Sequence, residues 1–236
     1  MTRRRWIADE VSGNHAAITG AHADHLVRVL RARVGQEFDI SAENAVRRGR
    51  IITIAEERVE FELGAEIPVP ACANVTLLLA VFKFDRMEWA IEKCTELGIS
   101  RIIPTITRRT DSHLAAASGK RVERWRRIAR EASEQSRRVS AAEISAPVNL
   151  GEAMCESNGL HIVLSESEDQ VPLPDVLAAH SARAIALAIG PEGGWTEDEL
   201  QSFQAAGWIS ASLGRTILRA ETAAIAATAV VFSQLL

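Results

Sequence analysis

A glycine-rich segment near residue 190 has the composition of a ligand-binding loop. It reads Ile189-Gly-Pro-Glu-Gly-Gly-Trp-Thr and lies between an apolar run and the start of a helical pattern. Glycine lets the backbone approach a ligand and present its N–H groups, and open α/β sheets bind ligands beyond the carboxyl ends of their strands. The segment is not a P-loop, because no Gly-Lys-Ser/Thr follows, and it is not Gly-x-Gly-x-x-Gly. It predicts either a ligand-binding loop or a tight turn between a strand and a helix.

A second candidate segment, Leu213-Gly-Arg-Thr-Ile-Leu-Arg-Ala-Glu-Thr-Ala, carries most of the basic charge of the C-terminal region. Of the three arginines after residue 140, two lie here, Arg215 and Arg219, and Glu221 follows two residues after Arg219. Charged side chains at the junction of an apolar strand and an apolar helix indicate a site. The alternative is an ion pair at the start of the helix.

Two basic segments come earlier in the chain. Lys83-Phe-Asp-Arg-Met-Glu follows an apolar run, and residues 121–138 hold seven arginines against three glutamates. Arginine can neutralise phosphates and bind them in a bidentate manner. A solvated helix face would have the same charges, so the phosphate-binding and the structural interpretations both stay open. Trp125, inside the second segment, is expected in the core.

The net charge of −4 hides a strong asymmetry along the chain. Residues 1–140 hold 24 of the 27 basic side chains and 19 acidic ones, whereas residues 141–236 hold 3 basic and 12 acidic ones. A basic front half indicates an anionic partner such as a nucleic acid. Genome composition is the other explanation for so many arginines.

The cysteines and histidines form neither a metal site nor a disulfide pattern. Cys72, Cys94 and Cys155 lie far apart without a Cys-x-x-Cys pair, and the six histidines give no ligand set. We therefore expect no metal and no disulfide, and we expect the cysteines to be small buried side chains.

The hydropathy pattern predicts neither a transmembrane helix nor a signal peptide. No run of 18 apolar residues exists, and the N-terminus becomes acidic before an apolar signal core could form. We expect a cytoplasmic protein without membrane attachment.

After residue 74, strands and helices alternate in a way that would position the two candidate segments. Continuous apolar runs predict strands buried in a largely parallel sheet, which is typical of an α/β domain. Asp85 is the expected N-cap of one helix and Gly98 its stop, and Thr196 and Glu199 form an expected capping box. The predicted strands are 75–82, 99–104, 160–164, 184–189 and 208–213, and the predicted helices are 85–97, 119–136, 196–206 and 219–234.

The first 70 residues have a different pattern. Short apolar runs separated by Gly, Asn and charged turns predict β-strands, interrupted by one helix over residues 22–31. The segment of residues 63–71 contains two prolines and is expected to be a linker. These features place a domain boundary near residue 70.

Together, the motifs resemble those of one family, the 16S ribosomal RNA uridine-N3 methyltransferases, a branch of the knotted SPOUT-type methyltransferases. The matching signatures are Lys-x-Asp-Arg-Met-Glu with Lys-x-x-Glu-Leu-Gly, Glu-Ala-x-Glu-Gln-x-x-Arg, Gly-Pro-Glu-Gly-Gly, and Leu-Gly-x-x-Ile-Leu-Arg-x-Glu-Thr-Ala. Their order and spacing match as well. The segment His25-Leu-x-x-Val-Leu-Arg is similar to part of the family's small RNA-binding barrel.

The resemblance implies a fold and a set of partners. Residues 1–70 would form a PUA-like RNA-binding β-barrel. Residues 71–236 would form an α/β SPOUT domain with a trefoil knot and a mostly parallel sheet. A homodimer of this kind would use S-adenosylmethionine, without a metal, to methylate N3 of a uridine in the 16S ribosomal RNA of the small ribosomal subunit.

The resemblance also implies site residues. The catalytic candidates are Arg219, which would stabilise negative charge on the uracil, and Glu221 and Glu192, either of which would orient Arg219 or accept the N3 proton. S-adenosylmethionine is expected to contact Leu164, Ile189, Gly190, Pro191, Glu192, Gly193, Gly194, Leu213, Gly214, Ile217, Leu218 and Arg219. RNA is expected to contact Arg3, Arg4, Arg5, His25, Arg28, Arg31, Lys83, Arg86 and Arg138.

Two other functions stay open at the level of sequence. One is a SPOUT methyltransferase that acts on another RNA position, and the other is a non-catalytic RNA-binding protein of ribosome assembly. Cofactor binding would separate the second from an enzyme, and the intact glycine-rich segment disfavours it. A nucleotide hydrolase is disfavoured because the segment lacks a phosphate-binding lysine and metal-binding carboxylates.

Overall fold

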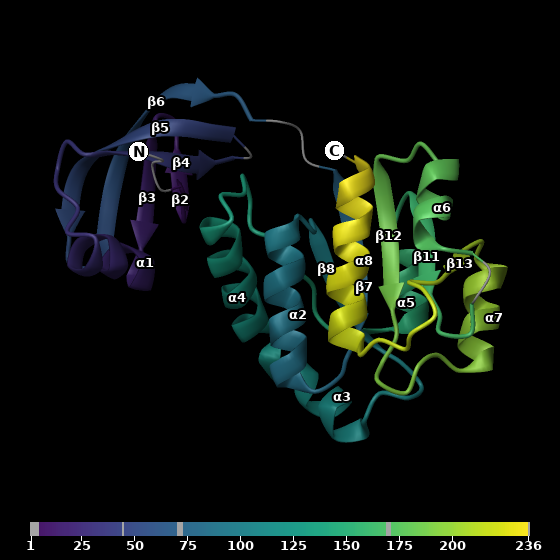
Figure 1. Ribbon diagram of the computed structural model, residues 1–236. Helices are drawn as coiled ribbons and strands as arrows, with labels where there is room; N and C mark the ends of the chain where they lie inside the picture. The colour runs from purple at the N-terminus through teal and green to yellow at the C-terminus, as the bar shows by residue number, and fades with distance from the viewer. Residues whose placement is uncertain (1–4, 44, 70–72, 169–170, 236) are drawn as a thin grey trace. The chain divides into compact units, whose positions relative to one another are not determined.

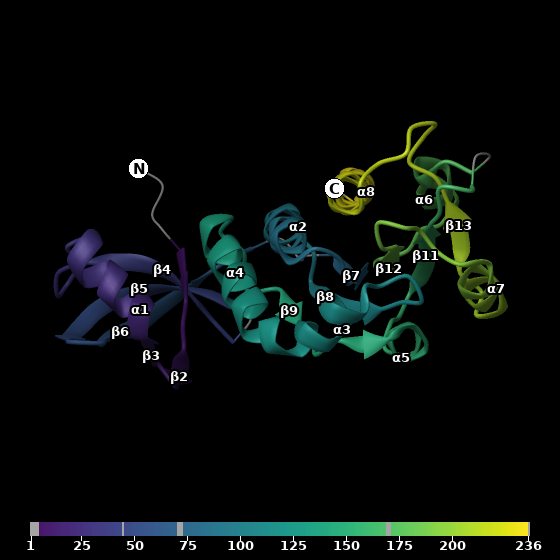
Figure 2. The ribbon, with the colours of Figure 1, turned by 90° about the horizontal axis from the view of Figure 1, so that it is seen from below.

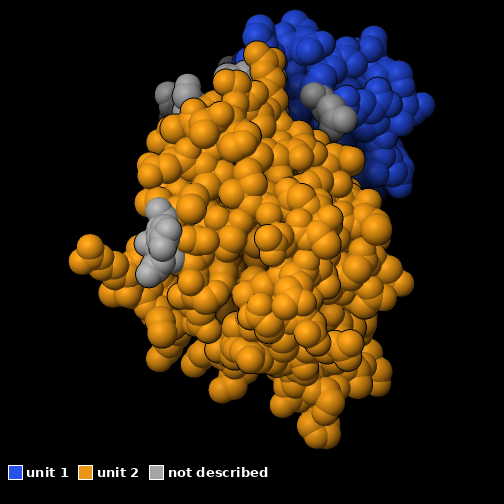
Figure 3. Space-filling view, turned by 90° about the vertical axis from the view of Figure 1, so that its right-hand side faces the viewer, with its two compact units in different colours: residues 1–71, 133–141 blue, residues 72–132, 142–236 orange. Residues whose placement is uncertain are grey.

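The chain folds into two compact units, which Figure 3 distinguishes by colour. The computed structural model describes residues 5–43, 45–69, 73–168 and 171–235. The first unit comprises residues 1–71 together with 133–141, and the second comprises residues 72–132 and 142–236. Nothing in the sequence pattern signals that residues 133–141 join the N-terminal strands.

The first unit is built on a six-stranded open sheet (Figure 1). The strand order is β1-β4-β5-β6-β3-β2, so β1 and β2 form the two edges. The β1–β4 pair is parallel and the other pairs are antiparallel. The strands are β1 (Arg5–Ile7), β2 (Glu10–Ser12), β3 (His15–Thr19), β4 (Glu37–Ala42), β5 (Ala45–Ala55) and β6 (Arg58–Ile67).

The core of the first unit is an apolar cluster that includes Trp6, Ile18, Ile40 and Phe61. The helical part is two elements rather than the single predicted helix: α1 (Gly20–Asp24) continues into a π-helical turn (His25–Val29), which adds the buried Leu26 to the cluster. The segment 133–141 is attached by polar contacts, since the Glu134 carboxylate lies 3.0 Å from Nδ1 of His22.

Two predictions for the first unit are incomplete. The strands β2 and β3 were not predicted, because β3 reads His-Ala-Ala-Ile-Thr and alanine gives little strand signal. The expected linker begins later than predicted, since β6 continues to Ile67, which pairs with Val46 of β5. Pairing of backbone groups extends a strand without an apolar side-chain pattern.

The second unit has a seven-stranded sheet in which every strand pair is parallel. The order is β10-β8-β7-β12-β11-β13, and β9 pairs with β8 outside this path. Strands β11 and β12 have the bounds predicted from sequence. The strands are β7 (Asn74–Ala80), β8 (Arg101–Ile106), β9 (Glu143–Ile144), β10 (Val148–Asn149), β11 (Leu160–Leu164), β12 (Ala184–Ile189) and β13 (Ile209–Ala211).

Helices cover both faces of this sheet (Figure 2). Their bounds are α2 (Phe84–Leu97), α3 (Ser112–Ser118), α4 (Val122–Gln135, preceded by a 3-10 turn at Gly119–Arg121), α5 (Leu150–Cys155), α6 (Leu173–Ala179), α7 (Glu197–Ala205) and α8 (Ala220–Leu235). The short helices α3, α5 and α6 were not predicted. In the described ranges, no helix combines the length and hydropathy that crossing a bilayer requires.

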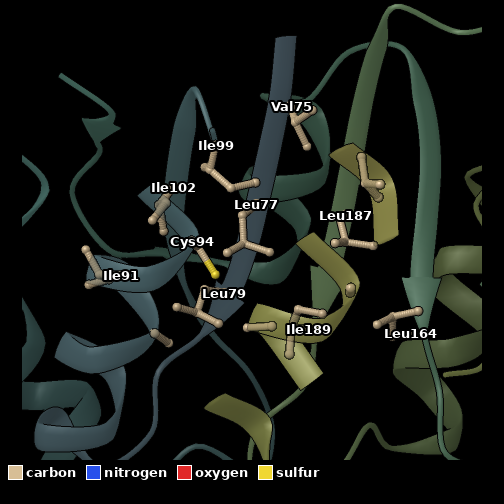
Figure 4. Close-up of a cluster of buried hydrophobic side chains, with 14 of the residues drawn as sticks. Val75, Leu77, Leu79, Ile91, Cys94, Ile99, Ile102, Leu164, Leu187 and Ile189 are labelled. Carbon is tan, nitrogen blue, oxygen red and sulfur yellow. The ribbon is translucent and has the colours of Figure 1, made fainter. Parts of the chain in front are cut away.

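The central strands are apolar on both sides because each face packs against helices. Leu77 and Leu79 of β7 point into the cluster that includes Ile91 and Cys94 of α2 (Figure 4), whereas Leu78 belongs to the cluster on the opposite face. Burial raises the pKa of the Cys94 thiol to about 12, so this cysteine is a packing residue and not a nucleophile. Trp125 of α4 is fully buried in the first of these clusters, as predicted.

After β13, which lies at an edge of the sheet, the chain returns across the sheet. Helix α8 therefore packs against α2 and contacts β12 and α6 (Figures 1 and 2). Gly98 ends α2 with a φ of +124°, and a Cβ atom there would lie 2.7 Å from the Phe232 ring of α8. The predicted helix stop is thus also the position that lets the two helices approach.

The helix caps and cysteines show which local predictions hold. The capping box of α7 is confirmed, with the Thr196 hydroxyl accepting the Glu199 N–H at 3.3 Å. The predicted N-cap Asp85 is wrong, because α2 begins at Phe84 and the Lys83 carbonyl already accepts the N–H of Met87 at 2.9 Å. The prediction of buried cysteines holds for Cys94 but not for Cys155, which is exposed at the end of the short helix α5; Cys72 lies outside the described residues.

A glycine before β11 gives a test of the sheet geometry. Gly159 has a φ of +96°, and a Cβ atom there would lie 2.1 Å from the Ala184 carbonyl oxygen. We expect Gly159→Ala to lower the free energy of unfolding by about 2–5 kcal/mol, because backbone strain and a backbone clash add. Gly207 is the matched control, since its φ is +78° with no atom within 4 Å of a Cβ. Gly207→Ala should cost only about 1–2 kcal/mol in the same urea unfolding experiment, and equal losses would contradict the clash.

Candidate functional site

A cavity of about 320 Å³ lies beyond the carboxyl ends of the parallel strands β11, β12 and β13. Three segments at the ends of these strands, Arg86 of α2 and the first turn of α8 form its wall. This is the edge at which open α/β sheets bind ligands, and the volume falls in the range of small-molecule sites. The lining comprises Arg86, Leu164, Ser165, Glu166, Ile189, Gly190, Pro191, Glu192, Gly194, Trp195, Ala211, Ser212, Leu213, Gly214, Arg215, Thr216, Ile217, Leu218, Arg219, Ala220 and Ala223.

The glycine-rich loop after β12 needs glycine for steric reasons. Gly194 has a φ of +69°, and a Cβ atom there would lie 2.6 Å from Oε1 of Glu166. At Gly190, a Cβ atom would lie 3.1 Å from the indole ring of Trp195. Both positions therefore allow the loop backbone to approach neighbouring parts of the cavity wall.

Trp195 links the glycine-rich loop to the neighbouring strand. The side chain is buried, and its indole N–H donates to the Leu164 carbonyl oxygen at 2.8 Å. The ring also packs edge-on against Phe203 of α7, with 4.9 Å between the ring centroids. This residue was not predicted as part of the site, although it directly follows the glycines in the sequence.

An ion-pair cluster joins α2, the glycine-rich loop and α8. Nη1 of Arg86 lies 2.8 Å from Oε1 of Glu192, and Nε of Arg86 lies 3.8 Å from Oε1 of Glu221. The Glu221 side chain is only 4% exposed, and its Oε2 atom is buried without a hydrogen-bond partner among the described residues. A buried carboxylate is costly without a counter-charge, so Arg86 stabilises Glu221 in this position.

Most of the residues expected at the cofactor line this cavity. Leu164, the 189–192 segment, Gly194 and residues 213–214 and 217–219 all belong to the lining, whereas Gly193 does not. Among the catalytic candidates, Arg219 and Glu192 line the cavity, and Glu221 lies behind Arg86 rather than in the lining. Arg86, expected to contact RNA, lines the cavity as well, and its contact with RNA stays a prediction.

The lining contains residues that the sequence argument missed. Glu166 and Ser165 directly follow β11, just as the glycine-rich loop follows β12. The rule that ligands bind beyond the carboxyl ends of strands could have found them. The other missed residues are Trp195, Ala211, Ser212, Ala220 and Ala223, whereas Arg215 lies in a segment that the sequence had already indicated as a site.

The residues expected to contact RNA are distributed over both units. In the first unit, His25, Arg28 and Arg31 are exposed on or just after the π-helical turn, and Arg28 forms an ion pair of 2.6 Å with Asp24. The guanidinium of Arg5 donates to the Arg137 carbonyl oxygen, next to Arg138. Lys83 is exposed after β7 in the second unit, and Arg3 and Arg4 lie outside the described residues. RNA binding by this set stays a prediction.

The basic helix α4 has a structural explanation for part of its charge. Arg124 lies 2.7 Å from the Glu88 carboxylate of α2, and Arg121 lies 3.9 Å from it. Arg126 pairs with Glu123 on the same helix at 2.7 Å. Several arginines here are therefore already opposed by carboxylates. Among the described residues, no cluster of His, Cys, Asp and Glu could hold a metal ion.

Comparison with known proteins identifies the family. Residues 70–232 match the family described as the RNA methyltransferase domain. The ribosomal RNA small subunit methyltransferase E of Synechocystis sp. is 34% identical over 90% of this chain and 71% of its own length, and that of Aquifex aeolicus is 31% identical over 96% and 97%. A crystal structure of a ribosomal RNA small subunit methyltransferase E from Neisseria gonorrhoeae, bound to S-adenosylmethionine, is similar with a TM-score of 0.84 and 29% identity, covering 97% of this chain and 96% of that one. The chain belongs to the RNA methyltransferase family and, within it, to the ribosomal RNA small subunit methyltransferase E group.

The ion-pair cluster predicts a specific pattern of stabilities. We expect Arg86→Met to lower the free energy of unfolding by about 1–3 kcal/mol, because it leaves Glu221 buried without its counter-charge. The loss is moderate because Arg86 is itself partly exposed, so that water already screens part of the interaction. The double variant Arg86→Met/Glu221→Gln should regain part of this loss, since a neutral amide needs no cation. Urea unfolding measures all variants.

The control for these variants is Glu192→Gln, which removes the exposed partner of Arg86. It should lower the free energy of unfolding by less than about 1 kcal/mol. The interpretation fails if Arg86→Met is as stable as the parent protein, or if the double variant is no more stable than Arg86→Met.

Proposed function

We propose that this protein transfers a methyl group from S-adenosylmethionine to N3 of a uridine in the 16S ribosomal RNA of the small ribosomal subunit. The observation that carries the proposal is the cavity at the carboxyl edge of the parallel sheet, built from the two segments whose motifs belong to this family. The group name and the cofactor bound by the Neisseria relative support the same chemistry.

The cavity lining fits S-adenosylmethionine in its chemistry. This cofactor has a flat heteroaromatic base, a ribose, and an amino acid end with both an ammonium and a carboxylate. The lining offers apolar side chains such as Leu164 and Leu218, the carboxylates of Glu166 and Glu192, and the guanidinium groups of Arg215 and Arg219. Gly190 and Gly194 supply the close backbone approach. Bound S-adenosylmethionine supplies an electrophilic methyl group at its sulfonium.

The protein's own residues prepare the uridine for reaction. N3 of uracil normally carries a proton and pairs with adenine, so the nucleotide must be unpaired and brought into the site. The proton has to leave, and negative charge then develops on the uracil. Arg219, exposed in the cavity wall, is the group that stabilises this charge.

The two carboxylate candidates have different environments. Glu192 is 40% exposed and lines the cavity, so it can reach a substrate and accept the N3 proton directly or through water. Glu221 is buried and pairs with Arg86, so it acts as a positioning residue that holds Arg86 and, through it, Glu192. We assign the proton acceptor to Glu192.

The family also implies features at the level of the whole fold. We infer that residues 71–236 form a SPOUT domain with a trefoil knot, that two copies of the chain form a homodimer, and that residues 1–70 form a PUA-like RNA-binding domain. The return of the chain from β13 across the sheet to α8 supports the knot. An enzyme of bacterial ribosomal RNA would act in the cytoplasm.

Neighbouring glycines give a matched test of the cofactor loop. Gly194→Ala should weaken S-adenosylmethionine binding at least about tenfold, because the new Cβ has to displace Glu166 and strain the backbone. Gly193→Ala should leave the affinity within about twofold, since Gly193 is outside the lining and its Cβ would only touch the Arg109 side chain at 3.4 Å. Titration calorimetry measures both affinities. Equal affinities of the two variants would refute the loop assignment.

The proposed reaction is tested by mapping methylated uridines in 16S ribosomal RNA from cells with and without this protein. One N3-methyluridine should be lost without the protein and restored by the parent gene. A loss at another kind of position would indicate a different target, and no loss would indicate a non-catalytic role.

Arg219→Ala should reduce methylation in vitro by at least about a hundredfold, because a fixed charge partner in the transition state is removed. Its urea unfolding curve should match that of the parent protein, since Arg219 is exposed. Turnover close to that of the parent protein would exclude Arg219 from the mechanism.

A further inference from the structure

Three exposed arginines lie in or next to the cavity wall. We call Arg109, Arg215 and Arg219 the cation rim: Arg215 and Arg219 line the cavity, and Arg109 lies against the glycine-rich loop. All three are exposed. Within the ranges that the structure describes, none of the three forms an ion pair, in contrast to Arg86, Arg121, Arg124 and Arg126 of the same unit.

Arg109 is held in place without losing its charge. Its guanidinium donates to the Gly193 carbonyl oxygen, and its Nη1 lies 3.9 Å from where a Cβ of Gly194 would be. A guanidinium has five N–H donors, so most of them remain available to a ligand. The uncharged Gly193 carbonyl thus orients Arg109, whereas Arg124 and Arg126 of α4 form ion pairs with glutamates.

The covalent structure of an RNA substrate would bring phosphate groups to the mouth of the cavity. This argument rests on the proposed function, in which one nucleotide enters the cavity with its base. The phosphates on either side of that nucleotide are covalently tied to it, so they lie at the mouth of the cavity. Arginine binds phosphate oxygens well, and an unpaired arginine releases a counterion from RNA when it does so.

We propose that Arg109 and Arg215 of the cation rim bind the phosphodiesters that flank the target uridine, while Arg219 faces the base, and that Arg109 is an RNA-contacting residue of the second unit. Glu166 and Glu192 lie in the same wall and disfavour phosphates deeper in the cavity. The phosphates are therefore confined to the mouth, and the uncharged base is the part that enters.

The test measures the affinity of the full-length protein for a 16S ribosomal RNA transcript over a series of salt concentrations. Arg109→Gln removes the charge but keeps an amide that can donate to the Gly193 carbonyl. We expect about a four- to fivefold loss of affinity at 0.15 M salt and a salt slope shallower by about 0.7–0.9, as for the loss of one phosphate contact. Combining it with Arg215→Gln should shallow the slope about twice as much.

Arg183 provides the matched control. It is also exposed and without an ion pair in the described ranges. Because it directly precedes β12, it lies at the amino ends of the parallel strands, whereas the cavity lies at their carboxyl ends. Arg183→Gln should leave the affinity for RNA and the salt slope unchanged. If Arg183→Gln and Arg109→Gln weaken RNA binding equally, the rim has no special role and the proposal is wrong.

Calorimetry with S-adenosylmethionine separates the two anions that the rim could bind, a phosphate of RNA and the carboxylate of the cofactor. Arg109→Gln should bind S-adenosylmethionine as the parent protein does. Weaker cofactor binding together with unchanged RNA binding would overturn the proposal. Failure of the proposed function would be seen separately, as the absence of methylation by the parent protein.

Discussion

The hydrogen bond from the Trp195 indole to the Leu164 carbonyl oxygen fixes the relation between two walls of the cavity. The indole N–H is buried, and a buried donor is costly without an acceptor, which the end of β11 supplies here. The ring can lie against the loop backbone because Gly190 has no side chain. One buried donor therefore holds the glycine-rich loop of β12 beside the end of β11. The third wall, residues 211–220, belongs to β13 and the start of α8, and packing of α8 against α2 brings it to the same place.

The arginines of the second unit divide into two groups by their surroundings. Arg86 and Arg124 face glutamates and join α2 to other elements, so their charge stabilises the fold. Arg109, Arg215 and Arg219 face solvent at the cavity, so their charge is available for a ligand. Residue type alone does not separate these groups, because all of them are arginines in basic or isolated segments. The carboxylates that neutralise the first group come from distant parts of the chain.

The sequence predicted five of the seven strands in the sheet of the second unit and missed the two-residue strands β9 and β10. Strands buried on both faces produce continuous apolar runs, and β11 and β12 were predicted with the bounds that the structure has. The capping box of Thr196 and Glu199 is also local, since both partners lie within four residues. The short helices α3, α5 and α6 and the alanine-rich strand β3 were missed, because segments this short depend on packing against distant elements rather than on their own pattern.

For the site, the sequence by itself determined which segments have the residues for chemistry: the glycine-rich loop, and the segment with Arg215, Arg219 and Glu221. Each of these motifs spans only a few consecutive residues, so it can be recognised from the sequence of that segment alone. Only the tertiary structure decided the roles of individual side chains. It placed Arg86 in the cavity wall and paired it with the buried Glu221. It also left Gly193 outside the lining and added Glu166, Trp195 and Arg109 to the site. The reason is that burial and ion pairing join residues that are far apart in the chain, and no local pattern records which charge will face which.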